Sequence, residues 1–130
     1  MWADLAKTLA DPTVVLYGST SGWAAWLAAQ IARDELVVLV APDEQFARRL
    51  EEDVRFWFGL VAPASGEPAS AATDELDPIT PLPAIDVSPY ADLAPDRTSI
   101  VERLATLYRL ATPALRPRIV ITSAEALMRK

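Results

Sequence analysis

The chain has 130 residues, 52% of them hydrophobic, and a formal net charge of −6 at pH 7. This length fits one domain, since domains commonly have about 100–150 residues, and the apolar content is enough for a core. The sequence has no cysteine and no histidine. Disulfide bonds, thiol or imidazole nucleophiles and the usual zinc sites are therefore excluded, and any catalysis would rest on carboxylates, hydroxyls, lysine and arginine.

Charge and hydropathy also limit the expected partners. Lys7 and Lys130 are the only lysines, whereas nucleic-acid-binding proteins usually carry a basic patch. We therefore expect weak or no DNA binding by this chain alone, unless its arginines cluster on one face. No apolar run reaches the ~20 residues that span a bilayer, and residues 1–12 lack the pattern of a signal peptide. We expect a cytoplasmic location and no membrane partner.

The first third of the chain predicts two helices and two strands. Apolar spacing indicates a short amphipathic helix over residues 1–11, and residues 13–17 form an apolar strand. A helix over 22–33, capped by Thr20 or Ser21, is apolar on almost every side and should be buried. The uninterrupted run at 36–41 (LVVLVA) is typical of a parallel strand covered on both faces.

A longer amphipathic helix follows, from Asp43 through Phe58, with Gly59 at its end. Glu51 and Arg55 are four residues apart on its wet side and should pair, as should Glu44 and Arg48. Its apolar stripe comprises Phe46, Leu50, Val54, Trp57 and Phe58.

The composition changes abruptly over residues 62–83, which hold five prolines, four acids and no Lys or Arg. This predicts a flexible acidic loop, because such a segment has too little apolar surface to offset the entropy of ordering. Its acids could bind a divalent cation, although their spacing matches no calcium loop. These acids are Glu67, Asp74, Glu75 and Asp77.

The last third predicts a short strand at 84–87, a proline-broken loop at 88–97 and a helix to about residue 110. Ser99 and Glu102 form a capping box for this helix. A strand at 118–122 (RIVIT) follows, and Ser123 caps a helix that has barely begun when the chain ends. The helix that ends near residue 110 has one apolar face. This face, or the segment Leu127–Met128, would be exposed if the chain is a piece of a longer protein. The face comprises Ile100, Val101, Leu104, Leu107, Tyr108 and Ala111.

Strands that alternate with helices, each strand a continuous apolar run, predict an α/β fold with a mainly parallel sheet of about four strands. The loop after the first strand lies where a phosphate-binding loop sits, but the pattern G-x-x-x-x-G-K-[ST] is incomplete. No lysine and no magnesium-binding hydroxyl occupy the required positions, where Trp23 and Ala24 stand. The loop is interpreted as a degenerate nucleotide site, with weak anion binding or a plain turn as alternatives. It comprises Gly18, Ser19, Thr20, Ser21, Gly22, Trp23 and Ala24.

Other candidate residues have structural interpretations. Asp43 and Glu44 follow a strand as a Walker B acid pair would, but a proline separates them from it, and capping of the next helix is favoured. The loop before the Ser99 helix could be locked by ion pairs and hydrogen bonds or could contact another domain. Its candidate residues are Tyr90, Asp92, Asp96 and Arg97. We predict no catalytic residue and no metal ligand set.

Three motifs of the sequence occur in an order that a known class of protein also has. The glycine turn, the segment VLVAPDEQFARRLEED and the segment IVITSAEALMRK resemble motifs I, Ia and Ib of the first RecA-like domain of superfamily 2 helicases. The stretch DVSPYADLAPDRTSIVERLATLYRLAT resembles the region that joins these motifs in bacterial transcription-repair coupling factors (Mfd). The N-terminal module of that family is similar to the damage-recognition subunit UvrB. The resemblance runs from about residue 10 to the C-terminus.

The resemblance implies a three-layer RecA-like fold of the P-loop NTPase class, with a degenerate nucleotide site and no cofactor in this chain. Residues 1–130 would be one such domain in a longer protein, acting as a non-catalytic scaffold and regulatory packing module. In the full-length family, ATP and magnesium serve motors elsewhere, and the partners are UvrA, RNA polymerase and DNA. The main UvrA contact would lie outside this chain. DNA contact by motif Ia is not carried over, because Asp43 and Glu44 would repel phosphate.

Two other functions remain open at this stage. One is an active nucleotide-binding or ATP-hydrolysing domain that uses an atypical loop. The other is an unrelated α/β interaction domain. Calorimetry with ATP and Mg²⁺ separates the enzyme from the scaffold.

Overall fold

The computed structural model describes residues 15, 17–61, 76–85 and 97–128. Three strands form one parallel sheet in the order β1-β3-β2, and helices flank it. The strands are β1 (Val37–Ala41), β2 (Ile79–Leu82) and β3 (Ile119–Ser123). The helices are α2 (Ser21–Ile31), α3 (Glu44–Val61), α4 (Arg97–Ala111), the 3₁₀ turn η1 (Pro113–Leu115) and α5 (Ala124–Met128).

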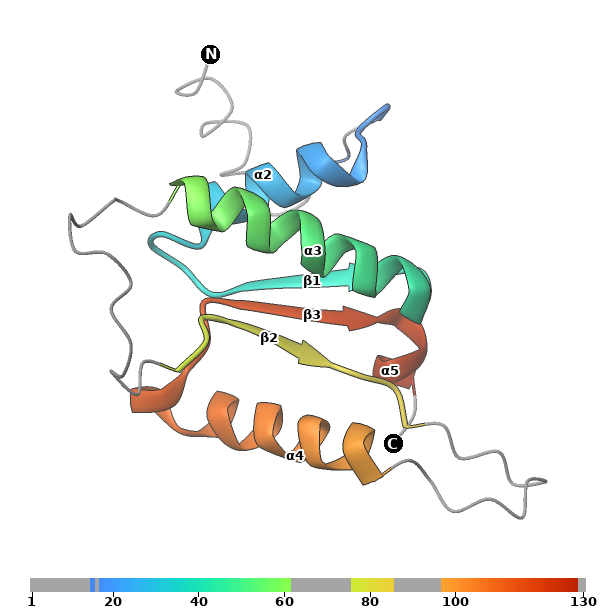
Figure 1. Ribbon diagram of the computed structural model, residues 1–130, viewed down its shortest axis with the longest axis vertical. Coiled ribbons are helices and arrows are strands. Elements are labelled where there is room, and N and C mark those ends of the chain that lie inside the picture. The colour runs from blue at the N-terminus through green and yellow to red at the C-terminus, as the bar shows by residue number, and fades with distance from the viewer. Residues whose placement is uncertain (1–14, 16, 62–75, 86–96, 129–130) are drawn as a thin grey trace.

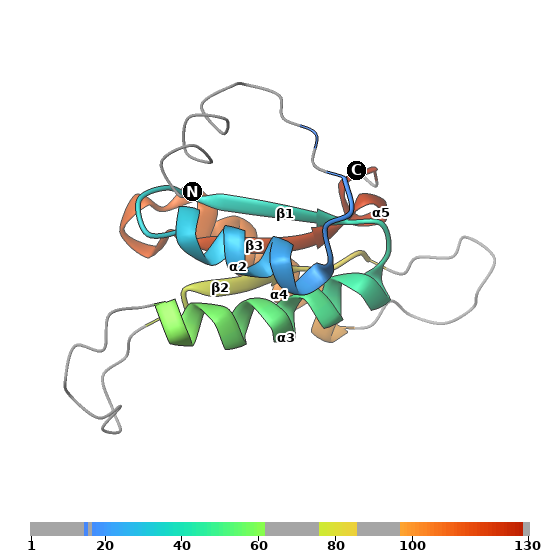
Figure 2. The ribbon, with the colours of Figure 1, turned by 90° about the horizontal axis from the view of Figure 1, so that it is seen from above.

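The helices lie on both sides of the sheet, which makes three layers (Figure 1). Helices α2 and α3 lie side by side above the sheet, and α4 runs below it (Figures 1 and 2). The central strand β3 is buried along its whole length, as a parallel strand between two layers should be. The core combines small alanines of α2 with larger residues of α3, β2 and β3, namely Leu50, Val54, Ile79, Ile119 and Ile121. The predicted parallel α/β architecture is confirmed, with three strands in the described residues.

Strand β1 and the predicted strand at 13–17 differ from expectation. Strand β1 was expected to be covered on both faces, but Val38 and Val40 are 51% and 53% exposed. These two side chains alternate with Val37 and Leu39, which pack on the core, so one face of β1 lacks cover among the described residues. In the predicted strand 13–17, Val15 and Tyr17 are exposed and belong to no strand, and the other three residues lie outside the described ranges.

Strand β2 lies at Ile79–Leu82. Of the strand predicted at 84–87, residues 84 and 85 belong to no strand, and residues 86 and 87 lie outside the described ranges. The sequence argued against the true position because Pro81 lies within it. Proline is tolerated there because, in the described sheet, β2 pairs only with β3, so the missing N–H faces no second strand. Strand β2 therefore occupies part of the predicted flexible segment 62–83, of which residues 62–75 lie outside the described ranges.

Helix α3 begins as predicted but ends later. The Asp43 carboxylate accepts a hydrogen bond from the Phe46 N–H at 2.7 Å, which confirms its capping role. Gly59 does not end the helix, which continues to Val61. The predicted pair of Arg55 with Glu51 is present at 2.8 Å, and Arg55 also contacts Asp77 at 2.8 Å.

Burial lowers the pKa of the Arg55 guanidinium, but the hydrogen bonds and charges of Glu51 and Asp77 outweigh this effect and raise its pKa above the ordinary value. The pairs link the C-terminal half of α3 to the start of β2.

Helix α4 starts at Arg97, so Ser99 lies in its first turn and the predicted capping box is wrong. The less exposed side of α4 combines the half-buried Ile100 and Leu110 with polar residues that bond to the rest of the fold. Thr106 is buried and its hydroxyl donates to the Pro81 carbonyl at 2.6 Å. Arg103 donates to two carbonyl oxygens, of Pro83 at 3.0 Å and of Ala126 at 3.1 Å. The apolar face of α4 consequently points away from the sheet.

The end of the described chain follows the prediction. The Ser123 hydroxyl accepts from the Ala126 N–H at 3.1 Å and caps α5, and Leu127 and Met128 are exposed. Across the residues that the structure describes, no helix combines the length and the apolar character that crossing a membrane would require.

Candidate functional site

The predicted nucleotide loop leads directly into the N-terminus of α2. It borders a shallow hollow of about 320 Å³ formed by residues 17–20 and Trp23. Gly18 has a φ of +73°, in the left-handed region that favours glycine, so the turn depends on this residue. Gly22 lies in the first turn of α2, and a Cβ added there would meet nothing within 4 Å. The glycine spacing therefore serves the turn at Gly18 but is not sterically required at Gly22.

The chain's own atoms bond to the N-terminus of α2. The Thr20 hydroxyl accepts from the Trp23 N–H at 3.3 Å, and the Thr20 carbonyl accepts from the Ala24 N–H at 3.0 Å. The first N–H groups of a helix are the groups that bind phosphate in a nucleotide loop, and here a side-chain cap takes one of them. Among the described residues that line this hollow, none is a Lys or Arg. The arrangement offers a helix N-terminus without a cation to neutralise a triphosphate.

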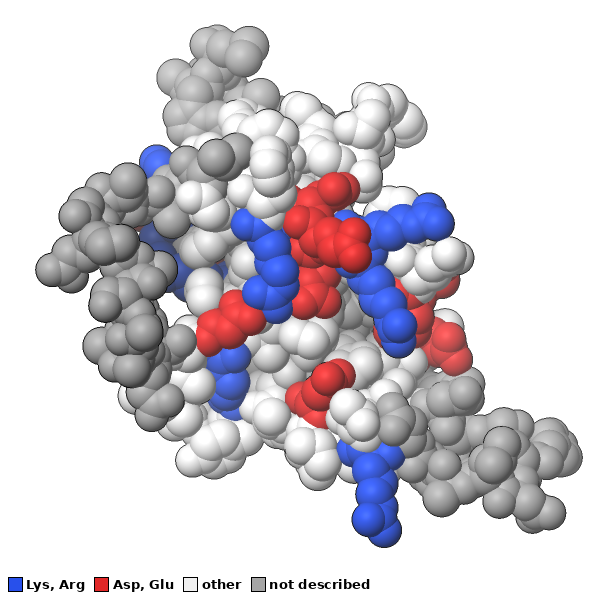
Figure 3. All heavy atoms as spheres, viewed as in Figure 1, with Lys and Arg blue, Asp and Glu red and all other residues white. Residues whose placement is uncertain are grey.

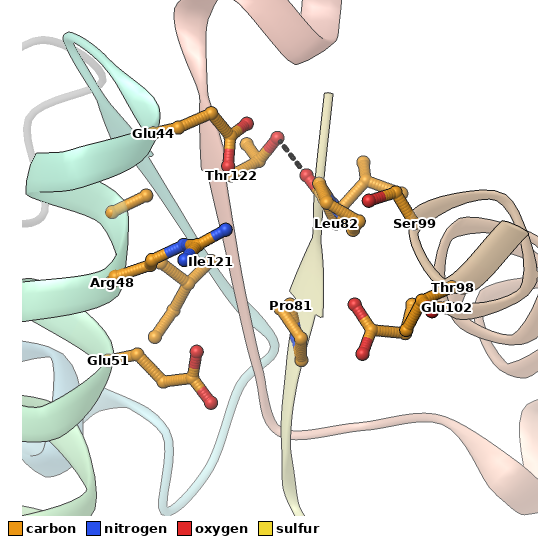
Figure 4. Close-up of a pocket in the computed structure, with 12 residues that line it drawn as sticks. Glu44, Arg48, Glu51, Pro81, Leu82, Thr98, Ser99, Glu102, Ile121 and Thr122 are labelled. Atoms are coloured by element: carbon orange, nitrogen blue, oxygen red, sulfur yellow. Dashed lines mark hydrogen bonds between the residues drawn. The ribbon is translucent and has the colours of Figure 1, made fainter. Parts of the chain in front are cut away.

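A second hollow lies at the carboxyl ends of the strands, between the N-terminal halves of α3 and α4 (Figure 4). Ligands of open parallel sheets commonly bind outside the carboxyl ends of the strands. The crevice has a volume of about 420 Å³. Its lining residues are Glu44, Ala47, Arg48, Glu51, Pro81, Leu82, Pro83, Thr98, Ser99, Glu102, Ile121 and Thr122.

Glu44 organises the upper end of this crevice. One oxygen of its carboxylate accepts from the Ser123 hydroxyl at 2.7 Å and from the Ala84 N–H at 2.8 Å. Ser123 is fully buried and in turn caps α5. Glu44 was interpreted as a helix cap beside Asp43, and its actual role is to tie α3 to the ends of β2 and β3. The signal for this role was a serine at the end of one parallel strand and an acid just after its neighbour.

The crevice is mainly acidic. Glu51 on α3 and Glu102 on α4 lie on opposite walls, and Arg48 extends from the α3 wall beside Glu51 (Figure 4). Such a lining repels phosphate, so this crevice is not a replacement nucleotide site. Over the described part of the chain, no group of three His, Cys, Asp or Glu residues is placed to hold a metal ion.

The structure describes only some of the other predicted site residues. Of the acids considered for cation binding, Asp77 is bonded to Arg55 and to the Ile79 N–H, and Glu67, Asp74 and Glu75 lie outside the described residues. Of the predicted contact loop, Arg97 is exposed at the start of α4, whereas Tyr90, Asp92 and Asp96 lie outside the described residues.

Surface charge is mixed on the face that carries α3. Acidic and basic side chains alternate there without forming a basic patch (Figure 3). A protein that neutralises DNA phosphates needs its cations gathered along one surface, so this face is poorly suited to DNA.

Comparison with known proteins gives one informative similarity. The chain is 34% identical over 98 residues to a transcription-repair-coupling factor of Myxococcus xanthus. The match covers 72% of this chain and 7% of that relative, so the chain spans a small part of the relative's length. No family model matches the chain, and no solved structure matches it. The chain is thus similar to a short region of a transcription-repair-coupling factor, in agreement with the resemblance of its motifs.

Proposed function

We propose that this chain is a non-catalytic, RecA-like segment of a transcription-repair coupling factor, and that it serves as a scaffold and packing module. The similarity to the Myxococcus protein supports the family, and the three-layer parallel α/β fold is compatible with a RecA-like domain. The observation that carries the non-catalytic role is the start of α2. There, Thr20 caps the helix, and the described residues that line the adjoining hollow include no cationic side chain.

The proposal extends to the longer protein. Residues 1–130 would form one degenerate domain within it, without a cofactor of their own. ATP-driven motors elsewhere in the polypeptide would act on DNA and displace stalled RNA polymerase, and UvrA would be recruited mainly by a neighbouring domain. The loop with Tyr90, Asp92, Asp96 and Arg97 would contact other domains.

The substitution Gly22→Asp tests the non-catalytic role within the full-length coupling factor. A carboxylate in the first turn of a helix is tolerated because it complements the helix dipole, and a Cβ at residue 22 has open space around it. The same carboxylate would repel a bound phosphate. We expect the rate of ATP-dependent RNA polymerase displacement to stay within about twofold of the unmodified protein, a difference of less than 0.5 kcal/mol in activation free energy.

Gly22→Ala is the matched control, since it adds the Cβ without the charge. If Gly22→Asp lowers the displacement rate tenfold and Gly22→Ala does not, a phosphate binds at α2 and the non-catalytic role is wrong.

A further inference from the structure

Helix α4 presents its apolar side to the exterior. Four residues on this side form what we call the α4 stripe: Val101, Leu104, Leu107 and Tyr108. Their exposed fractions are 64%, 61%, 44% and 64%, respectively. Residues 101, 104 and 108 are spaced by three and four, so their side chains lie along one line of the helix. The lower edge of the molecule, where α4 lies in Figure 1, is mostly white in Figure 3, with one basic side chain protruding at its right.

Helix α4 cannot rotate so as to bury the α4 stripe in the core. The opposite side of α4 already bonds to the sheet through Arg103, Thr106 and Arg109. Rotating the helix to bury the stripe would break these bonds and leave their acceptors unpaired, among them the Pro81 carbonyl of β2. The helix is therefore fixed with its apolar line outward, and a contiguous apolar patch of this kind marks a contact surface.

Charge around the stripe indicates what it contacts. Of the three arginines of helix α4, Arg103 and Arg109 lie on the side that faces the sheet, so they do not flank the stripe. Arg97 is exposed at the start of the helix, and Arg116 is exposed just after η1, which packs on α4. A partner with acidic side chains beside an apolar line fits this surface.

The size of the stripe indicates where the partner comes from. The largest apolar patch on a typical monomer covers about 300–600 Å², and a stripe of four partly exposed side chains is of that order. A stable complex between separate proteins buries about 800 Å² on each side, which is more than the stripe provides. A segment of the same polypeptide needs less area, because linkage supplies an effective concentration of about a millimolar. The chain spans 7% of its relative's length, so a protein of that kind has ample additional sequence to supply such a segment.

We propose that the α4 stripe docks an amphipathic helix with an apolar line and acidic flanks, supplied by another domain of the same longer polypeptide. This proposal rests on the proposed function, because it requires the chain to be part of a coupling factor. A second copy of the chain is a poorer occupant, because its own stripe is flanked by the exposed Arg97 and Arg116 and not by acidic side chains.

Hydrogen–deuterium exchange of the full-length coupling factor tests this docking. In the unmodified protein, a docked helix should protect the backbone amides of α4. The double substitution Leu104→Asp and Tyr108→Asp places charges in the contact, and we expect α4 amides to exchange at least about tenfold faster, equivalent to 1.4 kcal/mol of lost protection. Phe56→Asp, at an exposed position of α3, is the matched control and should leave α4 exchange unchanged.

The same double substitution in the 130-residue chain separates lost docking from a weakened helix. There the partner is missing, so α4 exchange should not change. Three outcomes would overturn the proposal: equal α4 exchange in the two full-length proteins, equal acceleration in the 130-residue chain, or concentration-dependent dimers of that chain that the substitutions abolish. Each of these outcomes leaves the Gly22→Asp result unaffected, so the docking proposal can fail while the proposed function stands.

Discussion

Arg109→Ala is expected to lower the free energy of unfolding by about 3 kcal/mol, because hydrogen bonds from charged donors contribute about 1.5–3 kcal/mol each and are not additive. The Arg109 guanidinium donates to the Asp77 carbonyl at 2.7 Å, to the Leu115 carbonyl at 3.1 Å and to the Thr80 hydroxyl. It thereby joins α4 to the start of β2 and to η1. Urea unfolding followed by circular dichroism measures the change.

Arg116→Ala is the control for this prediction. Arg116 is an exposed arginine close to Arg109 in the fold, and its loss should change stability by less than about 0.5 kcal/mol. If Arg109→Ala costs no more than Arg116→Ala, the bonds of Arg109 do not hold α4 against the sheet.

Glu44→Ala is expected to lower the free energy of unfolding by about 2 kcal/mol, because it removes a hydrogen-bond acceptor. The Glu44 carboxylate is the acceptor for the buried Ser123 hydroxyl and for the Ala84 N–H, and truncation leaves both donors without it. An unsatisfied buried polar group costs about 1–3 kcal/mol. Thermal unfolding should show the loss as a lower Tm.

Two further variants test whether hydrogen bonding or charge accounts for the stabilising effect of Glu44. Glu44→Gln keeps a carbonyl acceptor without the charge, so it should recover about half of the lost stability. Glu52→Ala removes an exposed carboxylate from the same helix and should have little effect. A Glu44→Gln protein as unstable as Glu44→Ala would show that charge, and not hydrogen bonding to Ser123, sets the contribution.

Continuous apolar runs were the most informative part of the sequence. The segments LVVLVA and RIVIT predicted two strands to within one residue, and their lack of alternation correctly predicted a parallel sheet. Local capping chemistry was also readable, because Asp43 and Ser123 bond to N–H groups only three residues away. Signals of this range need no knowledge of the tertiary fold.

Features that depend on distant partners could not be predicted in the same way. Strand β2 contains Pro81, and only its place at the edge of the described sheet makes this residue acceptable. Helix α4 has a clear apolar face, and amphipathicity alone says that this face should point inward. The bonds of Arg103, Thr106 and Arg109 to the sheet side reverse that orientation, and they involve residues 20 or more positions away or carbonyl groups that carry no sequence signal.

Some features of the candidate site could likewise be predicted from the sequence, and others could not. The missing lysine of the α2 loop was visible in the sequence, and the cap that Thr20 provides follows from its position before the helix. The crevice between α3 and α4 was missed, because its walls come from residues about 40 to 80 positions apart. Glu44 and Ser123 lie 79 residues apart and meet only because β1 and β3 are neighbours.

Isothermal titration calorimetry of the 130-residue chain with ATP and Mg²⁺ tests the central claim most directly. The account predicts no saturable binding with a Kd tighter than about 100 µM, that is, less than about 5.5 kcal/mol of binding free energy. Thr20 caps α2, and the part of the hollow's lining that the structure describes holds no cation, so the triphosphate has no strong partner among these residues. Saturable binding tighter than this limit, lost in Gly22→Asp and retained in Gly22→Ala, would contradict the account and identify the loop as a working nucleotide site.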